Sequence, residues 1–244
     1  MKFGRRMKLN NIKYNTNENL QVLKYDTSKF KFKEILENHM KKITTISKLE
    51  LLHLYIPKEK MPTDPIEGTA HTWGHDLLYA VDSGFRQNEK IEMSNTGFIN
   101  LYKEFIKYLR DDYFEFDIIY QSKPSLRIHY PEYTSYGIFH TDSEYNHPNS
   151  EINIWMPITE TKNTASMWIE QSIGKKDYKP VNMNFGEMLI FNSKLMHGNK
   201  VNEENYTRIS MDFRVIPKKL YKSNNKNSVT QGTKFEIGSY YSDE

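Results

Sequence analysis

Cysteine is absent from this chain of 244 residues. Its absence excludes disulfide bonds, thiolate zinc sites and thiol nucleophiles, and it is typical of a reducing compartment. Long apolar runs are missing too, since no stretch approaches the roughly 18 residues that a membrane-spanning helix needs. The basic start MKFGRRMKLNNIKYN lacks the apolar core of a signal peptide. We therefore expect a cytoplasmic protein with no membrane partner.

The chain also lacks a large excess of charge of one sign, because it has 34 basic and 31 acidic residues and a net charge of +3. This balance does not indicate a nucleic-acid partner, which a concentrated basic surface would. Aromatic residues are plentiful, with 17 Tyr and 13 Phe, and they favour β strands. A chain of this length is expected to form one domain over residues 1–244 with a substantial core. The sequence does not indicate an oligomeric state.

Residues 1–115 carry the helical patterns and are expected to form a mostly helical N-terminal elaboration. Apolar spacing predicts a helix that begins near residue 31, followed by a strand in LELLHLYI, residues 49–56. A second amphipathic helix is predicted over residues 95–114, with Asn95 or Thr96 as its N-cap.

Residues 116–217 change to short runs rich in Ile, Phe, Tyr and Trp, punctuated by Pro, Gly, Asn and Asp, which predicts strands. The runs are FDIIYQ, LRIHY, YGIFH, EINIWMPI, ASMWIE, YKPVNM, EMLIFN and TRISMDFRVI. So many short strands predict a mainly β protein, a sandwich or jelly roll with flanking α-helices. Residues 218–244 are expected to be a mobile C-terminal segment, although its final FEIGSYY is apolar enough to pack back onto the fold.

One strand has a clear period of two, in which alternate residues face opposite sides. In RISMDFRV the apolar residues alternate with polar ones, so the polar residues share a face. The residues of that polar face are Arg208, Ser210, Asp212 and Arg214.

The motif His140-x-Asp142 ends an apolar, aromatic run that is predicted to be a strand. Residues i and i+2 of a strand point to the same side, so one imidazole and one carboxylate can converge on a metal ion. His197, after the apolar run EMLIFN, is the candidate third ligand. Two histidines and one carboxylate leave coordination positions open, as in non-haem Fe(II) oxygenases. By itself such a pair is more often a surface turn or a helix cap, so a further feature is needed.

That further feature is Arg208, which follows His197 by 11 residues on a predicted strand. An oxygenase that uses 2-oxoglutarate needs a cation for the distal carboxylate of this cosubstrate, and arginine binds carboxylates through two parallel hydrogen bonds. Ser210 can add a hydroxyl donor from the same face of the strand.

With these motifs the chain resembles the Fe(II)/2-oxoglutarate-dependent dioxygenases, in particular the phytanoyl-CoA dioxygenase-like branch and the oxygenases of streptomycin biosynthesis clusters. The resemblance covers residues 120–217 and rests on FHTDSEYNHP, EINIWMPIT, ASMWIEQSIGKKDY, FGEMLIFNSKLMHGNKVN and TRISMDFRV. It implies a double-stranded β-helix, a cupin-like jelly roll, over residues 116–217. It also implies Fe(II) on His140, Asp142 and His197, with 2-oxoglutarate on Arg208. Oxygen would be the oxidant, and succinate and CO2 would be products. The halogenating relatives lack the carboxylate ligand, so Asp142 points to hydroxylation.

Further polar residues are expected around this centre. The residues expected to reach the cosubstrate are Arg127, Asn153 and Asn199. The residues expected to face the substrate are Tyr145, Arg214, His129 and Trp168. Each has a purely structural alternative. Arg127 could be a surface arginine, Asn153 a core amide bonded to the backbone, and Trp168 part of the wall of the core. A polar pocket of this kind suits a small polar substrate, such as a sugar, an aminocyclitol or a glycan component, better than a long acyl chain.

Two other functions would use the same residues. A cupin-like isomerase or hydrolase could hold Mn or Zn on the three ligands, but it would not need Arg208 and Ser210. A non-catalytic β-barrel binding module could keep the three ligands for stability or sensing.

Overall fold

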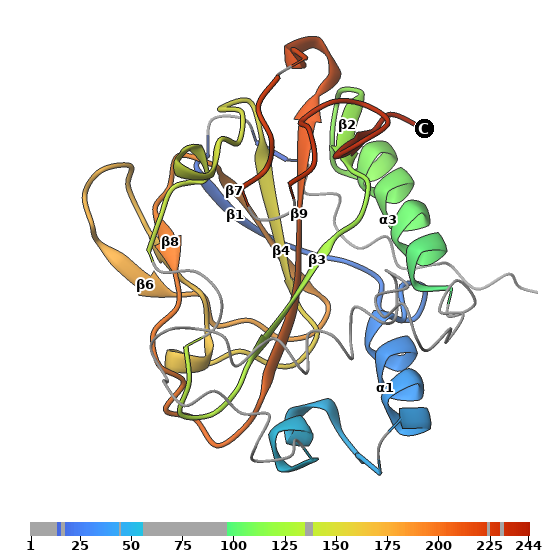
Figure 1. The fold of residues 1–244 in the computed structure, drawn as a ribbon, viewed down its shortest axis with the longest axis vertical. Helices are drawn as coiled ribbons and strands as arrows, with labels where there is room; N and C mark the ends of the chain where they lie inside the picture. Colours follow the sequence, from blue (N-terminus) through green and yellow to red (C-terminus); the bar gives the residue numbers. More distant parts are fainter. Residues whose placement is uncertain are drawn as a thin grey trace, which may run out of the picture.

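The computed structural model describes residues 14–15, 18–43, 45–55, 97–134, 139–223, 225–229 and 232–244. These residues form two antiparallel sheets, and the helices lie on the side of the larger sheet that faces away from the smaller one (Figure 1). Within the described part of the chain, no helix is long and apolar enough to cross a membrane.

The larger sheet has seven strands, and six of them follow the order β1-β7-β4-β9-β2-β10, while β3 also pairs with β9. Their bounds are β1 Leu20–Lys24, β2 Ile118–Gln121, β3 Ser125–His129, β4 Ile152–Pro157, β7 Glu187–Asn192, β9 Arg208–Pro217 and β10 Tyr241–Ser242. The strand β9 is the centre of this sheet, because it pairs with β4 as well as with β2 and β3.

The smaller sheet has the order β6-β5-β8, with β5 at Trp168–Glu170, β6 at Tyr178–Pro180 and β8 at His197–Gly198. An antiparallel bridge between His140 and His197 places His140 beside β8, where it extends the smaller sheet by one row. The larger sheet therefore contains the row β3-β9-β4-β7, and the smaller sheet contains the row His140-β8-β5-β6. This interleaved connectivity is the double-stranded β-helix, so the predicted fold class is confirmed.

The helices cover the outer face of the larger sheet through aromatic packing. They are α1 Phe32–Ile43 and α3 Phe98–Asp112, with short 3₁₀ helices η1 Leu49–Tyr55, η4 Asp142–Tyr145, η5 Asn163–Ala165 and η6 Lys218–Leu220. The rings of Tyr102 and Phe213 lie 5.1 Å apart, and those of Phe30 and Phe105 lie 4.9 Å apart. Because α3 presents its apolar face here, the sheet is buried on this side and its other face is left for the site.

The alternation predicted for β9 is confirmed. Ile209, Met211 and Val215 are buried in the core shared with the helices, whereas Arg208, Asp212 and Arg214 line a cavity between the two sheets. Since side chains alternate along a strand, one face of β9 builds the core and the other carries chemistry.

Two predictions in the N-terminal half need comment. The strand expected at residues 49–56 is wrong over its described part, because η1 occupies Leu49–Tyr55. Its buried residues Leu49 and Leu52 are three apart, a spacing that places both on one side of a 3₁₀ helix. The candidate caps Asn95 and Thr96 lie outside the described residues, and the structure places Gly97 at the N-cap of α3.

The end of the chain packs back onto the fold, as its apolar composition suggests. Strand β10 pairs with β2, and Phe235, Tyr240 and Tyr241 form a buried cluster with Ile119 and Ile216. The segment expected to be mobile therefore includes residues that complete the core next to the site.

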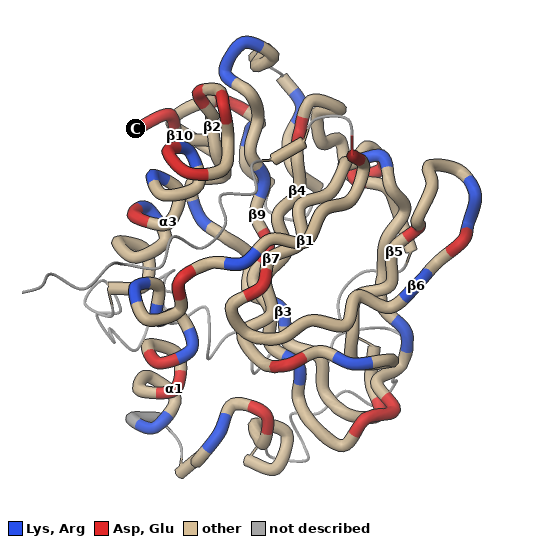
Figure 2. The backbone as a smooth tube through the Cα atoms, turned by 180° about the vertical axis from the view of Figure 1, so that it is seen from behind, with Lys and Arg blue, Asp and Glu red and all other residues tan. Residues whose placement is uncertain are grey.

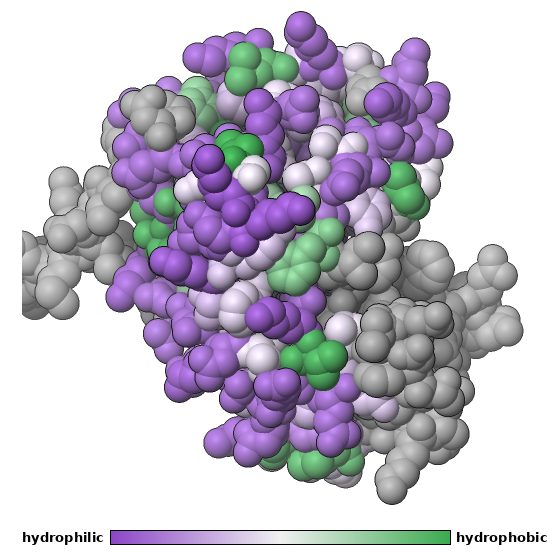
Figure 3. Space-filling model, turned by 90° about the vertical axis from the view of Figure 1, so that its left-hand side faces the viewer, coloured by the Kyte–Doolittle hydropathy of each residue, from purple (hydrophilic) through white to green (hydrophobic). Residues whose placement is uncertain are grey.

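The surface is mixed in charge and mainly hydrophilic. Basic and acidic residues alternate along the described chain, including α1 and α3 (Figure 2). On the face shown in Figure 3, apolar side chains stand as separate spots among hydrophilic ones. The face shown in Figure 3 therefore carries no extended apolar patch on its described residues.

Candidate metal centre

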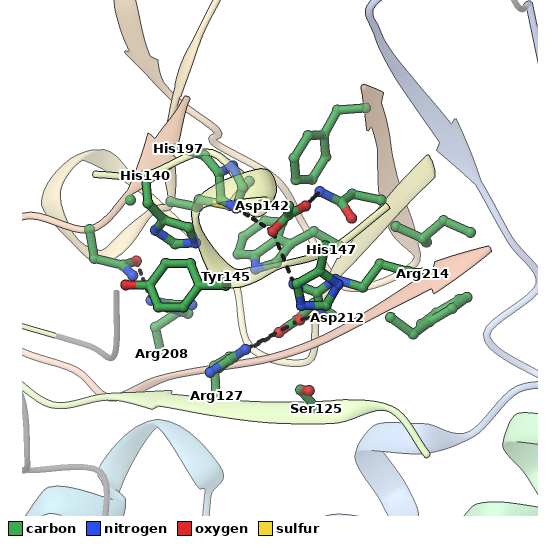
Figure 4. A pocket seen from close by; sticks show the side chains of 18 of the residues that line it. Ser125, Arg127, His140, Asp142, Tyr145, His147, His197, Arg208, Asp212 and Arg214 are labelled. Atoms are coloured by element: carbon green, nitrogen blue, oxygen red, sulfur yellow. Dashed lines mark hydrogen bonds and ion pairs between the residues drawn. The ribbon is translucent and has the colours of Figure 1, made fainter. Parts of the chain in front are cut away.

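Three side chains meet at the cavity between the sheets, and they are the three candidate ligands. One ligand atom each from His140, Asp142 and His197 lies within 4.8 Å of the other two (Figure 4). The two histidines face each other because their backbones form a pair of hydrogen bonds, each with an N···O distance of 3.0 Å. The structure thus brings together residues that are separated by more than fifty positions in the chain.

Asp142 reaches this centre through a turn and not from a strand, which corrects the expectation that both residues of the motif end a strand. It is the first residue of η4, whose N-cap Thr141 is extended. A capping box fixes the turn, because the Thr141 N–H donates to Glu144 Oε2 over 2.6 Å. The extended Thr141 keeps its two neighbours on the same side, so the two-residue spacing still brings imidazole and carboxylate together.

The Asp142 carboxylate is buried and held at both oxygens. Asn153 Nδ2 donates to its Oδ2, and Arg214 donates to its Oδ1 over 3.4 Å. Burial alone would raise the pKa of Asp142, but the Arg214 guanidinium, His197, His147 and the Asn153 amide together hold that pKa well below its usual range. The group is therefore an anion at neutral pH, as a metal ligand must be.

The orientation of the His197 ring is fixed by a hydrogen bond to the backbone. Its Nδ1 lies 3.0 Å from the Leu195 carbonyl oxygen, so this nitrogen carries the proton and donates it. The other nitrogen, Nε2, lies 3.9 Å from Asp142 Oδ1. Two imidazole nitrogens and one carboxylate form a donor set that Fe(II) accepts, so the residues present fit the ion that the sequence predicts.

Arg208 is buried in the wall of the same cavity, with 1% of its surface exposed. It donates to Ser210 Oγ and to Asn199 Oδ1 over 2.7 Å each, and its NH2 lies 3.2 Å from His129 Nδ1. None of these partners is a carboxylate, and among the described residues its Nε has no hydrogen-bond partner. Burial, and then the nearby Arg127, lower the pKa of Arg208 to about 9. A buried guanidinium with neutral partners is suited to binding an anion.

The other two arginines of the cavity already have a carboxylate partner. Arg127 Nε donates to Asp212 Oδ1 over 2.8 Å, and Arg214 NH1 donates to Asp212 Oδ2 over 2.9 Å. Burial would raise the pKa of Asp212, but the two guanidinium groups lower it. The sequence placed Asp212 only on the polar face of its strand, and the structure makes it the bridge between both arginines.

Of the remaining predicted residues, three line the cavity and two do not. Tyr145, Asn153 and Asn199 line the cavity, and the Tyr145 ring lies 4.7 Å from that of His140. His129 lies behind Arg208 and supports it. Trp168 is not among the described residues that line the cavity, since its indole donates to the Asn163 carbonyl and Lys200 lies 3.4 Å from its ring centre.

Two further residues line the cavity beside the predicted ones. One is His147, which lines the cavity and whose Nδ1 lies 2.8 Å from Glu151 Oε2. Tyr240 joins the lining from the C-terminal segment, and its ring lies 5.7 Å from that of His147. The apolar run FEIGSYY indicated that this segment packs, but no pattern in the sequence indicated where.

Comparison with known proteins supports the resemblance seen in the motifs. The chain is 33% identical over 129 residues to streptomycin biosynthesis protein StrG of Streptomyces griseus. This match covers 52% of the chain and 61% of that protein, so the chain spans less than two thirds of its relative. No family model matches the chain.

Distant likenesses are found among solved structures, two of which are described as non-haem enzymes. The apo form of the non-heme monooxygenase ThoJ has a TM-score of 0.49 and 10% identity over 86% of this chain and 78% of that one. The α-ketoglutarate-dependent carbocyclase SnoK from nogalamycin biosynthesis has a TM-score of 0.48 and 9% identity over 92% of both chains. EctD from S. alaskensis has a TM-score of 0.44 and 11% identity over 82% of this chain and 73% of that one. Likenesses at this level assign no function.

Proposed function

We propose that this protein is an Fe(II)- and 2-oxoglutarate-dependent dioxygenase that hydroxylates a carbon of a small polar substrate. The observation that carries the proposal is one cavity that contains both a two-histidine, one-aspartate cluster and a buried arginine with no carboxylate partner among the described residues. A metal-dependent isomerase or hydrolase would use the cluster but would have no use for the arginine.

The residues of the chain have separate tasks in this proposal. His140, Asp142 and His197 would hold Fe(II), which with 2-oxoglutarate and oxygen would supply the oxidation and give succinate and CO2. Arg208 would bind the distal carboxylate of 2-oxoglutarate. Ser210 and Asn199 accept hydrogen bonds from Arg208 and so fix the plane of its guanidinium. A fixed guanidinium loses little entropy when it binds a carboxylate.

The walls of the cavity suit a small polar molecule. The lining combines the apolar side chains of Trp155, Met167 and Phe191 with charged and hydroxyl groups. The apolar side chains reduce the room for water, while the polar groups give a substrate hydrogen-bond partners. A sugar or a component of a glycan fits this lining better than a long acyl chain.

The test is an anaerobic titration of the purified protein with Fe(II) and 2-oxoglutarate. We expect a visible charge-transfer band that needs both additions, because the keto acid binds iron directly, and we expect succinate after oxygen is admitted. A folded, metal-loaded protein that shows no band with 2-oxoglutarate would contradict the proposal and favour the isomerase or hydrolase.

A further inference from the structure

Two residues that line the cavity, His147 and Tyr240, have polar atoms that the described part of the chain leaves unused. The only side-chain hydrogen bond of His147 among the described residues runs from Nδ1 to Glu151, and the Tyr240 hydroxyl has none. Neither His147 Nε2 nor Tyr240 Oη is among the described polar atoms that are buried without a partner. Both atoms are therefore accessible to a molecule in the cavity, although most of each side chain is buried.

The buried carboxylate of Glu151 determines which ring nitrogen of His147 carries the proton. His147 Nδ1 lies 2.8 Å from Glu151 Oε2, and the Tyr241 hydroxyl donates to Oε1 of the same carboxylate. A carboxylate accepts hydrogen bonds, so the proton of the neutral imidazole is on Nδ1. The other nitrogen, Nε2, is then a hydrogen-bond acceptor. Since Glu151 is not among the residues that line the cavity, this acceptor is the part of the ring that a ligand can use.

The rings of His147 and Tyr240 are held next to each other by aromatic packing. Their centres lie 5.7 Å apart, and the Phe235 ring lies 4.7 Å from that of His147 and 4.9 Å from that of Tyr240. The turn around Asp142 brings this pair to the ligand cluster, because the His147 backbone N–H donates to the Asp142 carbonyl oxygen over 3.2 Å (Figure 4). Side chains that are already ordered lose little freedom when a ligand binds.

We propose that His147 and Tyr240 form a subsite that binds a hydroxyl group of the substrate. A hydroxyl group can donate to His147 Nε2 and accept from Tyr240 Oη at the same time, whereas a carboxylate or a carbonyl group has no hydrogen to donate to Nε2. The substrate class that follows is a polyol, such as a sugar or a cyclitol. The inference rests on the proposed function in one respect, because that function makes the molecule bound here the substrate.

The test compares small molecules that differ in their polar groups. The probes are myo-inositol and D-glucose, which carry hydroxyl groups, tetrahydropyran, which is the glucose ring without them, and cyclohexylamine, which carries an ammonium group. Binding to the full chain is measured by isothermal titration calorimetry, anaerobically with Fe(II) and 2-oxoglutarate and then again without them. We expect at least one of the two polyols to bind more tightly than tetrahydropyran and cyclohexylamine under both conditions.

Variants assign the binding to the two residues. Tyr240→Phe removes only the hydroxyl group, and His147→Asn keeps a donor for Glu151 but has no atom at the position of Nε2. Each variant should bind the better polyol about tenfold more weakly, and iron binding should be unchanged. Tyr221→Phe is the matched control, because Tyr221 packs against the same C-terminal cluster and lies outside the cavity lining. It should bind the polyol as the natural protein does.

The outcomes separate this inference from the proposed function. The inference is overturned, even if the visible band forms, when neither polyol binds, when cyclohexylamine binds more tightly than both polyols, or when polyol binding is unchanged in Tyr240→Phe. The Tyr240 variant decides the matter even if His147→Asn does not fold, because it keeps the aromatic ring. A missing band contradicts the proposed function, and polyol binding measured without iron then still decides whether the subsite exists.

Discussion

Asn153 donates a hydrogen bond from its side-chain amide to Oδ2 of Asp142, and this contact joins the central strand β4 to the predicted metal ligand. The register places Asn153 opposite Arg214 on β9, and Arg214 bonds the other oxygen of Asp142. Two adjacent strands of the larger sheet therefore orient a carboxylate that belongs to a turn. The sequence suggested that Asn153 contacts the cosubstrate, whereas the structure shows it supporting Asp142.

Replacing a member of the ligand cluster should abolish binding of Fe(II). We expect His140→Ala and Asp142→Ala to bind no measurable iron in equilibrium dialysis, because two ligands hold the ion too weakly. Asp111→Ala, which changes an exposed residue, is the control and should bind iron normally. Undiminished iron in the Asp142 variant would remove this residue from the site.

Replacing Asn153 should weaken iron binding without abolishing it. Loss of a partner that orients a ligand lowers metal affinity about 10- to 100-fold. We expect this loss for Asn153→Leu, which fills the space but cannot donate, and a smaller one for Asn153→Gln. If the Leu variant binds iron as the natural protein does, the hydrogen bond is not needed to position Asp142.

Replacing Arg208 should raise the 2-oxoglutarate concentration needed for turnover. Loss of one buried charge-assisted pair should cost about 2–5 kcal/mol of binding free energy. The visible band in Arg208→Ala should therefore saturate only at much higher 2-oxoglutarate, while iron binding is unchanged. An unaltered requirement would transfer the role to Arg214 or Arg127.

His129 should make the stability of the protein depend on pH. Burial, and then the charge of Arg208, lower the pKa of His129 to about 3. The folded state therefore binds fewer protons than the unfolded state below the ordinary histidine pKa of about 6.5. Stability should fall as the pH drops from about 6.5 toward 3, by about 2 kcal/mol at pH 5.

The matched variant is His129→Gln, which keeps an acceptor for Arg208 but does not titrate. Urea unfolding of both proteins between neutral pH and pH 5 should show a shallower decline for the variant. Parallel curves would mean that His129 does not contribute to the decline.

Tyr241 should contribute to stability through the C-terminal segment. Its hydroxyl donates to Glu151 Oε1, and both residues are buried. Tyr241→Phe leaves that carboxylate oxygen without its donor, which should cost about 1–3 kcal/mol of unfolding free energy. Tyr178→Phe, at a half-buried tyrosine of β6, is the comparison and should cost less.

The sequence by itself indicated the residues on which the proposed chemistry depends. The alternation in RISMDFRV fixed which residues of β9 face the core, because a strand has only two faces. The spacing in His140-x-Asp142 and the arginine that follows His197 indicated the ligand cluster and its neighbour. These signals are local, so they could be read without knowing the fold.

Only the tertiary structure decided which partners these residues have. Asp212 bridges two arginines, Asn153 bonds Asp142, and Tyr240 closes the cavity from the far end of the chain. Each of these contacts depends on strand register or on the docking of a distant segment. Register and docking follow from packing the whole core at once, so no short pattern in the sequence encodes them.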